Sequence, residues 1–464
     1  MEAPRLSKHM ISFLDDEIGY TIPSRSLVGS ILGLHMLVVL GVGAWLARRQ
    51  RLHQLAIVVP VAALIATGSL VAIGNQQTSA VPSTIATGQI ARVIPESSEV
   101  QVDSVAAIFS QESRRLQIES TPQTTTLLRD GDSSGEMRRL LWDDRGDSTW
   151  LYVTQPPGVV RHVESESMVT MPRPWNVQGR FSERGFEGRI RGIDANKCED
   201  AVILAIAAPA LAVDLKQYAL GAFVSGSDDV LSPDQFIDDK LMSDVQQDRQ
   251  DLIRKLVASE TPPMYGREPT MLVWTDPINS GVKFDDDFVR RGFTLASIPI
   301  RLERVSSGVG FQVPASFVRM EAVKSTVFNA QTGRWLEQMN KPSESELRCM
   351  LPKVLLPCKL NRASVIIKIN APSRTLEIKC LVDEEFVTLH RTVNPTGLLR
   401  FEIDQADALQ LDADGGLPLV ISISESLEER EAASQPIDPA EPKKPSRSTW
   451  EIDYVHVNLE GTTL

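Results

Sequence analysis

Two long apolar runs close together near the N-terminus constrain this chain more than any other feature. Residues 26–47 and 55–74 contain no charged side chain. Each has roughly the 20 residues that a helix needs to cross the hydrocarbon core of a bilayer. Pro60 and the glycines within the runs are tolerated in transmembrane helices. Two adjacent runs of this kind are rare in the core of a soluble protein, so we predict a two-helix transmembrane hairpin.

The segment between the runs predicts the orientation of the hairpin. It contains Arg48, Arg49 and Arg51, whereas the flanks outside the hairpin carry little net positive charge. Positive charge in a short loop marks the cytoplasmic side of a membrane, and Trp45 lies where an interfacial aromatic side chain belongs. We therefore expect a multi-pass protein of the cytoplasmic membrane, with the bilayer as its first partner. Both termini would lie outside the cytoplasm, the N-terminal one as a short extracytoplasmic segment, 1–25.

One ionisable side chain falls inside the predicted hairpin. His35 stands in the middle of the first apolar run. An intramembrane ionisable group is a candidate functional residue by default. The alternative is a structural role, either as a neutral imidazole that bonds across the hairpin or as a replacement for a semi-polar aromatic side chain, and we favour this structural interpretation.

The charge of the chain is unevenly distributed. The 464 residues have a formal net charge of −12. Residues 1–95 hold seven Lys or Arg and four Asp or Glu, for a net charge of +3. The remaining 41 basic and 56 acidic residues give −15. A large acidic region therefore follows a small membrane anchor, and an acidic region argues against nucleic acid as a partner because phosphate binding needs a basic face.

The region after the hairpin is rich in predicted strands. Short segments that alternate apolar and polar residues are typical of half-buried strands, and their close spacing favours β-sandwiches over alternating βα units. We expect a mainly β fold of two β-sandwich-like extracytoplasmic units. In the first, 75–335, the predicted strands are 99–109, 114–120, 138–144, 149–154, 159–165, 185–193, 200–215, 270–276 and 292–304. An amphipathic helix is predicted near 233–259, starting at Ser232-Pro233-Asp234.

The second predicted unit covers 336–464. Its predicted strands are 363–372, 375–382, 385–393, 398–404, 417–426 and 448–460. The segment 429–448 has no apolar periodicity and is rich in proline, so we predict a flexible loop there. The strand that follows this loop is expected to return and close the sandwich.

Several short motifs resemble catalytic or metal-binding patterns. Gly131-Asp132-Ser133-Ser134-Gly135 matches the nucleophile elbow G-x-S-x-G, but a predicted strand follows where the elbow needs a helix, so a hairpin turn fits better. The loop that starts at Asp130 resembles a calcium loop, yet its twelfth position is Leu141 instead of glutamate. The sequences 285–287 and 412–415 are acidic and are better read as solvated loops or turns. We predict no catalytic residue, no metal site and no cofactor.

The cysteines are sparse. Cys198, Cys349, Cys358 and Cys380 form no C-x-x-C pattern, and no two histidines have metal-ligand spacing. An exported location permits disulfides, and Cys349 with Cys358 is the pair that the spacing allows. Cys380 stands in an apolar strand, as a small core residue does. The sequence leaves the disulfide pattern open.

Short motifs precede the hairpin and recur through the strand-rich region: Ile22-Pro23-Ser24-Arg25, Gly185-x-x-Gly188-x-Ile190, Asp200-Ala201-Val202, Leu272-Val273-Trp274-Thr275-Asp276-Pro277 and Ile298-Pro299-Ile300. This set of motifs resembles the C-terminal part of an uncharacterised family of bacterial membrane proteins, common in planctomycetes and some Gram-positive bacteria. The resemblance runs over most of 18–330 and more loosely beyond.

The resemblance implies a topology and a fold and no activity. Family members typically carry a further extracytoplasmic part ahead of the Ile-Pro-Ser-Arg segment, often similar to a glutamine-amidotransferase-like or von Willebrand-like domain. This chain lacks that part, so we expect it to be a truncated or split member.

These observations favour a non-enzymatic membrane-anchored envelope protein. Its exported β-sandwiches would bind a protein or glycan partner, or scaffold a membrane complex. Two alternatives remain open. The chain is an accessory subunit of an exporter complex, or it is a hydrolase acting on envelope material, which would need two carboxylates or a Ser/His pair in one cleft.

Overall fold

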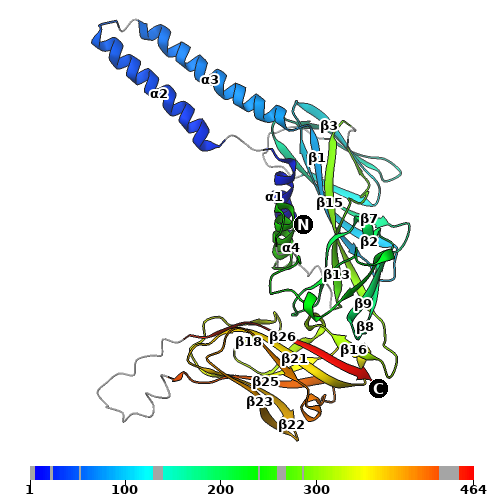
Figure 1. Cartoon of the computed structure of the whole chain (residues 1–464). Coiled ribbons are helices and arrows are strands. Elements are labelled where there is room, and N and C mark those ends of the chain that lie inside the picture. The colour runs from blue at the N-terminus through cyan, green and yellow to red at the C-terminus, as the bar shows by residue number, and fades with distance from the viewer. Residues whose placement is uncertain are drawn as a thin grey trace, which may run out of the picture. The chain divides into compact units, whose positions relative to one another are not determined.

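The structure is a computed structural model that describes 6–20, 24–51, 54–128, 139–238, 241–258, 268–284, 287–427 and 449–464 (Figure 1). It is mainly β, with an apolar helical hairpin near the N-terminus, as the sequence predicts. The chain divides into two compact units. Unit 1 comprises Met1–Gln89, Val102–Val169 and Pro277–Phe293, and unit 2 comprises Ile90–Gln101, Thr170–Asp276 and Thr294–Leu464.

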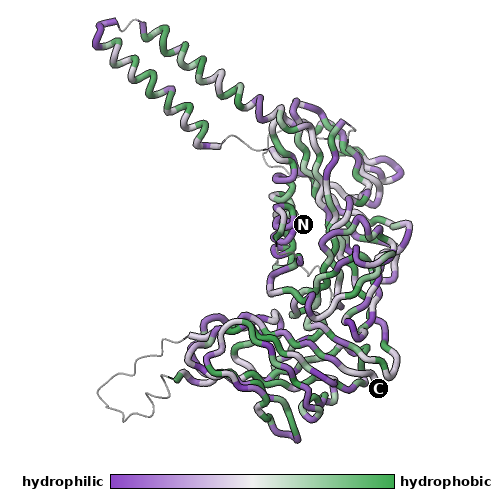
Figure 2. Tube along the Cα trace, viewed as in Figure 1, coloured by the Kyte–Doolittle hydropathy of each residue, from purple (hydrophilic) through white to green (hydrophobic). Residues whose placement is uncertain are grey.

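The two apolar runs form helices α2, Arg25–Arg48, and α3, Leu55–Ala80. Ser24 caps α2, because its side-chain oxygen accepts the amide of Leu27 at 3.2 Å. Both helices are long and apolar enough to cross a membrane, and their most apolar stretches are not buried inside the protein. Figure 2 shows the hydrophobic residues along the two helices. The second helix continues past the expected end at 74 into polar residues.

A further helix, α1, Leu6–Ile18, precedes the hairpin. It buries Met10, Leu14 and Ile18, which recur every four residues and so share one helix face. Phe13 contacts Phe293 edge-to-face, with ring centroids 4.8 Å apart. The sequence predicted only a short extracytoplasmic segment here, so the helix is a new finding.

Unit 1 is a sandwich of two sheets. One is the β1-β2-β7-β4 part of an 11-stranded sheet, and the other is the four-stranded sheet β14-β3-β6-β5. The strands are β1, Thr84–Val93; β2, Glu99–Phe109; β3, Arg114–Ser120; β4, Thr124–Leu128; β5, Arg139–Trp142; β6, Ser148–Gln155; β7, Val160–Thr170; and β14, Val282–Lys283. Buried side chains from both sheets, such as Ile108 and Ile118, form one hydrophobic cluster between them. Strands β1 and β2 continue across the boundary into unit 2.

The first part of unit 2 is a largely antiparallel β region with one helix. Strands pair in the order β11-β10-β13-β15, and β15 also pairs in parallel with β8 of the β8-β9-β12 group. The strands are β8, Asn176–Ser182; β9, Gly185–Arg191; β10, Glu199–Leu204; β11, Leu211–Val213; β12, Ala222–Ser225; β13, Thr270–Thr275; and β15, Val289–Leu302. The single expected strand 200–215 is therefore two strands, β10 and β11, that form a hairpin.

The amphipathic helix of this part, α4, is Asp244–Ala258 and starts later than predicted. Ser243 and Gln246 explain the difference. The Gln246 amide donates to the Ser243 hydroxyl at 3.3 Å, and the Ser243 amide donates to Gln246 Oε1 at 3.1 Å. This reciprocal pair is a capping box, which starts a helix more effectively than the Ser232-Pro233 segment.

The C-terminal part of unit 2 is a second β-sandwich, as the sequence predicts. Its sheets have the orders β16-β26-β21-β24 and β17-β20-β25-β22-β23, beside the small hairpin β18-β19. The strands are β16, Gly310–Val313; β17, Arg319–Lys324; β18, Phe328–Asn329; β19, Arg334–Trp335; β20, Ser343–Met350; β21, Cys358–Asn370; β22, Thr375–Val382; β23, Glu385–Val393; β24, Thr396–Ile403; β25, Gly416–Ile423; and β26, Glu451–Thr463. The last strand, β26, pairs with β16 and β21 and so closes the sandwich, as expected. The loop predicted at 429–448 lies outside the described residues.

Candidate functional site

The strongest candidate site is a cleft in unit 2 between β10, β11, β12 and α4. We call it the polar cleft. Its volume is 690 Å³, within the range of small-molecule sites. Its charged lining consists of five carboxylates and two cations: Glu199, Asp200, Asp214, Asp229, Asp238, Lys216 and Arg249.

Arg249 organises one wall of the polar cleft. It projects from α4, and its Nη1 lies 2.5 Å from Asp200 Oδ2 and 2.8 Å from Glu199 Oε2. Its guanidinium also lies over the ring of Trp274, 5.2 Å from the centroid, in cation–π geometry. The side chains of Arg249 and Asp200 are only 16% and 12% exposed, so this ion pair is far better shielded than a surface pair.

The backbone of Asp200 is held in an unusual conformation. Its φ is 45°, in the left-handed region that non-glycine residues rarely adopt. The pairing of β10 with β13 shifts register between Glu199 and Val202, which marks a β-bulge at this point. Gln246 Nε2 donates to Asp200 Oδ1 at 3.1 Å and completes the fixing of the carboxylate. Bulges of this kind re-aim a side chain next to functional sites.

The opposite wall carries Asp229. Burial raises its pKa, and the negative charges of Asp238 and Asp228 add to the rise. The amide of Gly226 donates to Asp229 Oδ2 at 2.7 Å and partly opposes the shift. The wall therefore presents a desolvated carboxylate to the cleft.

Cys198 also lines the cleft, but it is not an activated nucleophile. Burial raises the pKa of its thiol to about 11. At neutral pH the group is a neutral thiol, and the thiolate is the reactive form. No histidine is among the described lining residues, so a Ser/His or Cys/His pair does not meet here. The arrangement is suited to accepting hydrogen bonds from hydroxyl or ammonium groups.

The sequence did not single out the polar cleft, although two family-like motifs contribute to it. Asp200 of Asp200-Ala201-Val202 and Trp274 of the 272–277 motif both contact Arg249. Gly188 of the 185–190 motif packs under Phe223, because a Cβ at this glycine would overlap the phenyl ring. The motifs therefore build the framework around the cleft.

The residues predicted to set membrane topology lie at the end of α2 and in the connection that follows it. Arg48 ends α2, and Arg49 and Arg51 follow it in the short connection to α3. The Arg49 guanidinium stacks 4.3 Å from the ring centroid of Trp45, which is half exposed.

His35 lies at mid-height of α2. Its side chain is half-buried, and its Nδ1 is buried without a hydrogen-bond partner among the described residues. The predicted bond across the hairpin is therefore not formed through Nδ1.

The remaining sequence candidates do not assemble a site. The Gly131–Gly135 motif and the Asp130 loop lie outside the described residues, apart from Leu141, and so do 285 and 286. Asp287 lies 3.6 Å from Arg114 and is largely exposed. No group of three or more His, Cys, Asp or Glu in the described part of the chain is placed to hold a metal ion.

The acidic sequence at 412–415 is a turn, in agreement with the sequence reading. Asp412 Oδ1 accepts the amides of Asp414 and Gly416, both at 2.9 Å. Arg348 pairs with Asp412 at 2.6 Å and with Asp414 at 2.9 Å. Burial acts to raise the pKa of Asp412, but these hydrogen bonds and the Arg348 charge outweigh it and lower the pKa.

The four cysteines are free thiols. Cys349 is fully buried in β20 opposite Leu417, and Cys358 begins β21 in the other sheet of the sandwich. The allowed pairing of these two cysteines is therefore not formed. Cys380 is a buried core residue, as the sequence reading favoured.

Comparisons with known proteins place the chain in no family. No protein-family model matches it, and no curated protein does. Among solved structures it is similar to TmCBM61, solved in complex with beta-1,4-galactotriose, at 11% sequence identity. That match covers 30% of this chain and 86% of that chain, with a TM-score of 0.17. A TM-score of this size carries no argument about fold or ligand.

Proposed function

We propose that this chain is a membrane-anchored cell-envelope protein without enzymatic activity, whose extracytoplasmic β-rich units bind a hydroxyl-rich glycan of the envelope. The proposal has two parts, an anchor and a binding site. The anchor is supported by helices α2 and α3, and the binding site by the polar cleft.

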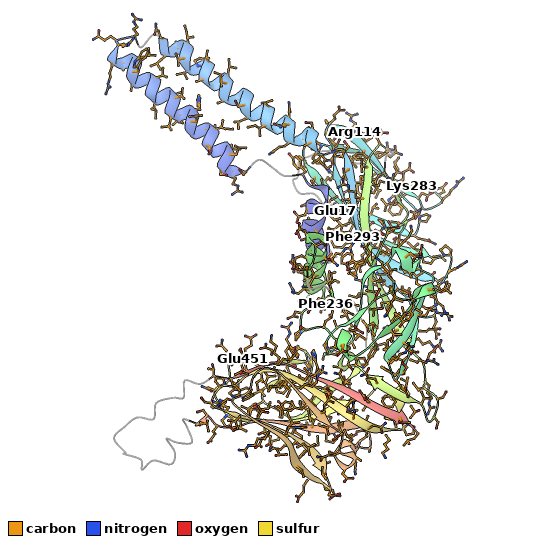
Figure 3. The ribbon with its side chains drawn as sticks, in the orientation of Figure 1. Glu17, Arg114, Phe236, Lys283, Phe293 and Glu451 are labelled. Atoms are coloured by element: carbon orange, nitrogen blue, oxygen red, sulfur yellow. The ribbon has the colours of Figure 1, made fainter. Side chains whose placement is uncertain are left out.

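The packing of α1 is the observation that carries the anchor. This helix precedes the hairpin, and the β1-β2-β7 sheet follows it. In unit 1 they are in contact: the Asp15 carboxylate lies 2.8 Å from His162 Nε2, and Tyr20 packs on Phe109 with centroids 4.7 Å apart. Because both ends of the hairpin meet in one folded unit, they belong on the same side of the membrane (Figure 3). An even number of crossings satisfies this requirement.

The charges then orient the anchor. Arg48, Arg49 and Arg51 at the turn of the hairpin place that turn in the cytoplasm by the positive-inside rule. The β-rich units consequently lie outside the cytoplasm. This orientation agrees with the acidic balance of the strand-rich region, which is unsuited to nucleic acid.

The polar cleft favours binding over catalysis. The one thiol among its described lining residues is protonated at neutral pH, and the Asp200 carboxylate, whose side chain is 12% exposed, is occupied by Arg249 and Gln246. Carboxylates and amides that converge on a cleft are acceptors and donors for sugar hydroxyls. The described lining contains no aromatic residue, the residue type that is enriched in protein–protein interfaces.

Binding of defined envelope oligosaccharides to the full chain in lipid nanodiscs tests the proposal. We expect saturable binding to at least one hydroxyl-rich fragment, about ten-fold weaker in Asp214→Asn, whose carboxylate lines the cleft. Glu344→Gln, at an exposed carboxylate that pairs with Lys379 outside the cleft, is the matched control and should bind normally. Normal glycan binding by Asp214→Asn would contradict the assignment of the polar cleft as the binding site. If a photocrosslinker at Lys216 captured a protein and no glycan, the partner would be a protein, and the glycan proposal would be wrong.

A further inference from the structure

A second cavity, in unit 1, opens on the β1-β2-β7 sheet. Its volume is 680 Å³. We call it the unit 1 pocket. Ile85, Thr87 and Gln89 of β1 line it, as do Ser104 with Ala106 of β2 and Val163 with Ser165 of β7. These residues alternate along their strands and therefore share one face of the sheet. The residues between them in β1 face α1, since a Cβ at Gly88 would meet Met10 and Leu14.

The far wall of the unit 1 pocket is the segment 277–284, and it is fixed in place. Gln89 is nearly fully buried and bonds twice to Ile278: its Oε1 accepts the Ile278 amide at 2.6 Å, and its Nε2 donates to the Ile278 carbonyl at 2.8 Å. Thr124 Oγ1 donates to the carbonyl of Ser280 at 2.8 Å. The pocket is therefore pre-formed, which lowers the entropy cost of binding.

Ser104 is the residue that marks this cavity as a site. Its side chain is 5% exposed, and its hydroxyl has no hydrogen-bond partner among the described residues. A buried hydroxyl without a partner costs about 1–3 kcal/mol, so native proteins rarely retain one without a reason. A ligand in the pocket would supply the missing partner.

The charge of the lining indicates the sign of the ligand. Lys283, Arg290 and Arg291 line the pocket, and no Asp or Glu does among its described residues. The chain as a whole has a net charge of −12, whereas the charged residues described in this lining are all cations. Arg290 and Arg291 are held by backbone carbonyls, those of Phe284 at 3.2 Å and Glu17 at 3.4 Å. Lys283 is exposed and is labelled in Figure 3.

Part of the uncharged lining is apolar. Ile85, Ala106 and Val163 belong to the hydrophobic cluster between the two sheets of unit 1, and Val282 and Phe284 pack against it. The pocket thus reaches from a cationic rim to the edge of a hydrophobic core. A ligand that fits both surfaces carries an anionic head and an apolar body.

We propose that the unit 1 pocket binds an anionic amphiphile. Its carboxylate or phosphate meets the cations of Lys283, Arg290 and Arg291, and its hydrocarbon part lies against Val163 and Phe284. An oxygen of the ligand pairs with the hydroxyl of Ser104. Fatty acids and phosphorylated lipids share this chemistry, and a membrane crossed by α2 and α3 would supply both. The inference is independent of glycan binding at the polar cleft.

Photocrosslinking of the full chain in nanodiscs tests the inference. The probe is a diazirine-bearing long-chain fatty acid, and labelled peptides are mapped by mass spectrometry. We expect saturable labelling within 282–292 or 104–106. Excess oleate and excess lysophosphatidate should each suppress this labelling at least five-fold if the pocket binds both fatty acids and phosphorylated lipids. Suppression by only one of the two competitors identifies which of these lipid classes the pocket binds. Inorganic phosphate at the same concentration should leave it unchanged, since it lacks an apolar body.

Two variants and one control complete the test. Ser104→Ala should weaken binding about three- to ten-fold, and Lys283→Gln about ten-fold. Ser104→Ala should also keep or raise the melting temperature, because it removes an unpaired buried hydroxyl, which separates loss of binding from loss of folding. Lys324→Gln, an exposed lysine of β17, should bind as the wild type does. Labelling that is confined to α2 and α3, or equal in all four proteins, would overturn the proposal.

Discussion

Removal of the Arg249 side chain tests the framework of the polar cleft. The Arg249→Met variant keeps the aliphatic bulk and deletes the charge that pairs with Asp200 and Glu199. Breaking a buried ion pair by removing one partner costs about 3–5 kcal/mol, because a charge is left uncompensated. The two side chains here are 16% and 12% exposed, so we expect a smaller loss of about 2–3 kcal/mol in the free energy of unfolding.

A double-mutant cycle isolates the ion pair from other effects. Asp200→Asn combined with Arg249→Met should cost less than the sum of the single variants, by about 1–2 kcal/mol, since the double variant buries no unpaired charge. Arg254→Met is the matched control on the same helix. Arg254 pairs with Asp251 at an exposed position, where ion pairs contribute about 0–1 kcal/mol.

Urea unfolding of the full chain in mild detergent measures these differences. Tryptophan fluorescence follows unfolding, and Trp274, one of the seven tryptophans, lies under the Arg249 guanidinium. Equal and small losses in the free energy of unfolding for Arg249→Met and Arg254→Met would refute the reasoning on this ion pair. So would a double-variant loss within about 0.3 kcal/mol of the sum of the losses in Asp200→Asn and Arg249→Met.

Three further predictions follow from buried residues. Leu14 is fully buried, so Leu14→Ala should lower the free energy of unfolding of unit 1 by about 2–5 kcal/mol and speed hydrogen exchange in α1. Unchanged hydrogen exchange in α1 would contradict the packing of this helix on unit 1. Burial lowers the pKa of His456 to about 4, below the value of about 6.5 in the unfolded chain. The free energy of unfolding should therefore be highest above pH 6.5 and fall by about 3 kcal/mol toward pH 4. Unfolding measured across this pH range should show a flatter dependence in His456→Gln. Gly188→Ala should destabilise unit 2, because its Cβ would overlap Phe223, and an unchanged melting temperature would contradict that packing.

The hairpin and most strands could be predicted from sequence because their signals are local. A run of 20 uncharged residues and a period-two alternation need no knowledge of partners. Helix α1 escaped prediction because its buried face consists of only Met10, Leu14 and Ile18 amid charged neighbours. Its burial depends on a sheet that follows much later in the sequence.

The polar cleft was beyond the reach of the sequence reading for a similar reason. Asp200 and Arg249 are far apart in the sequence. They form an ion pair because the β10 bulge sets the position of Asp200 and the start of α4 sets the position of Arg249. One local signal was available: Ser243-x-x-Gln246 fixes where α4 begins, and Gln246 and Arg249 then share a helix face. Nothing in the sequence marks Ser104 as an unpaired hydroxyl, since that property exists only after the pocket has formed.

Dual-reporter fusions measure the central claim, that one membrane hairpin returns the chain to the side from which it started. Reporters active only in the cytoplasm, or only outside it, are fused after Gln50, in the arginine-rich turn, and after Leu464. We expect the cytoplasmic reporter to be active after Gln50 and the extracytoplasmic reporter to be active after Leu464. Cytoplasmic activity at both positions, or an extracytoplasmic signal at Gln50, would contradict the claim.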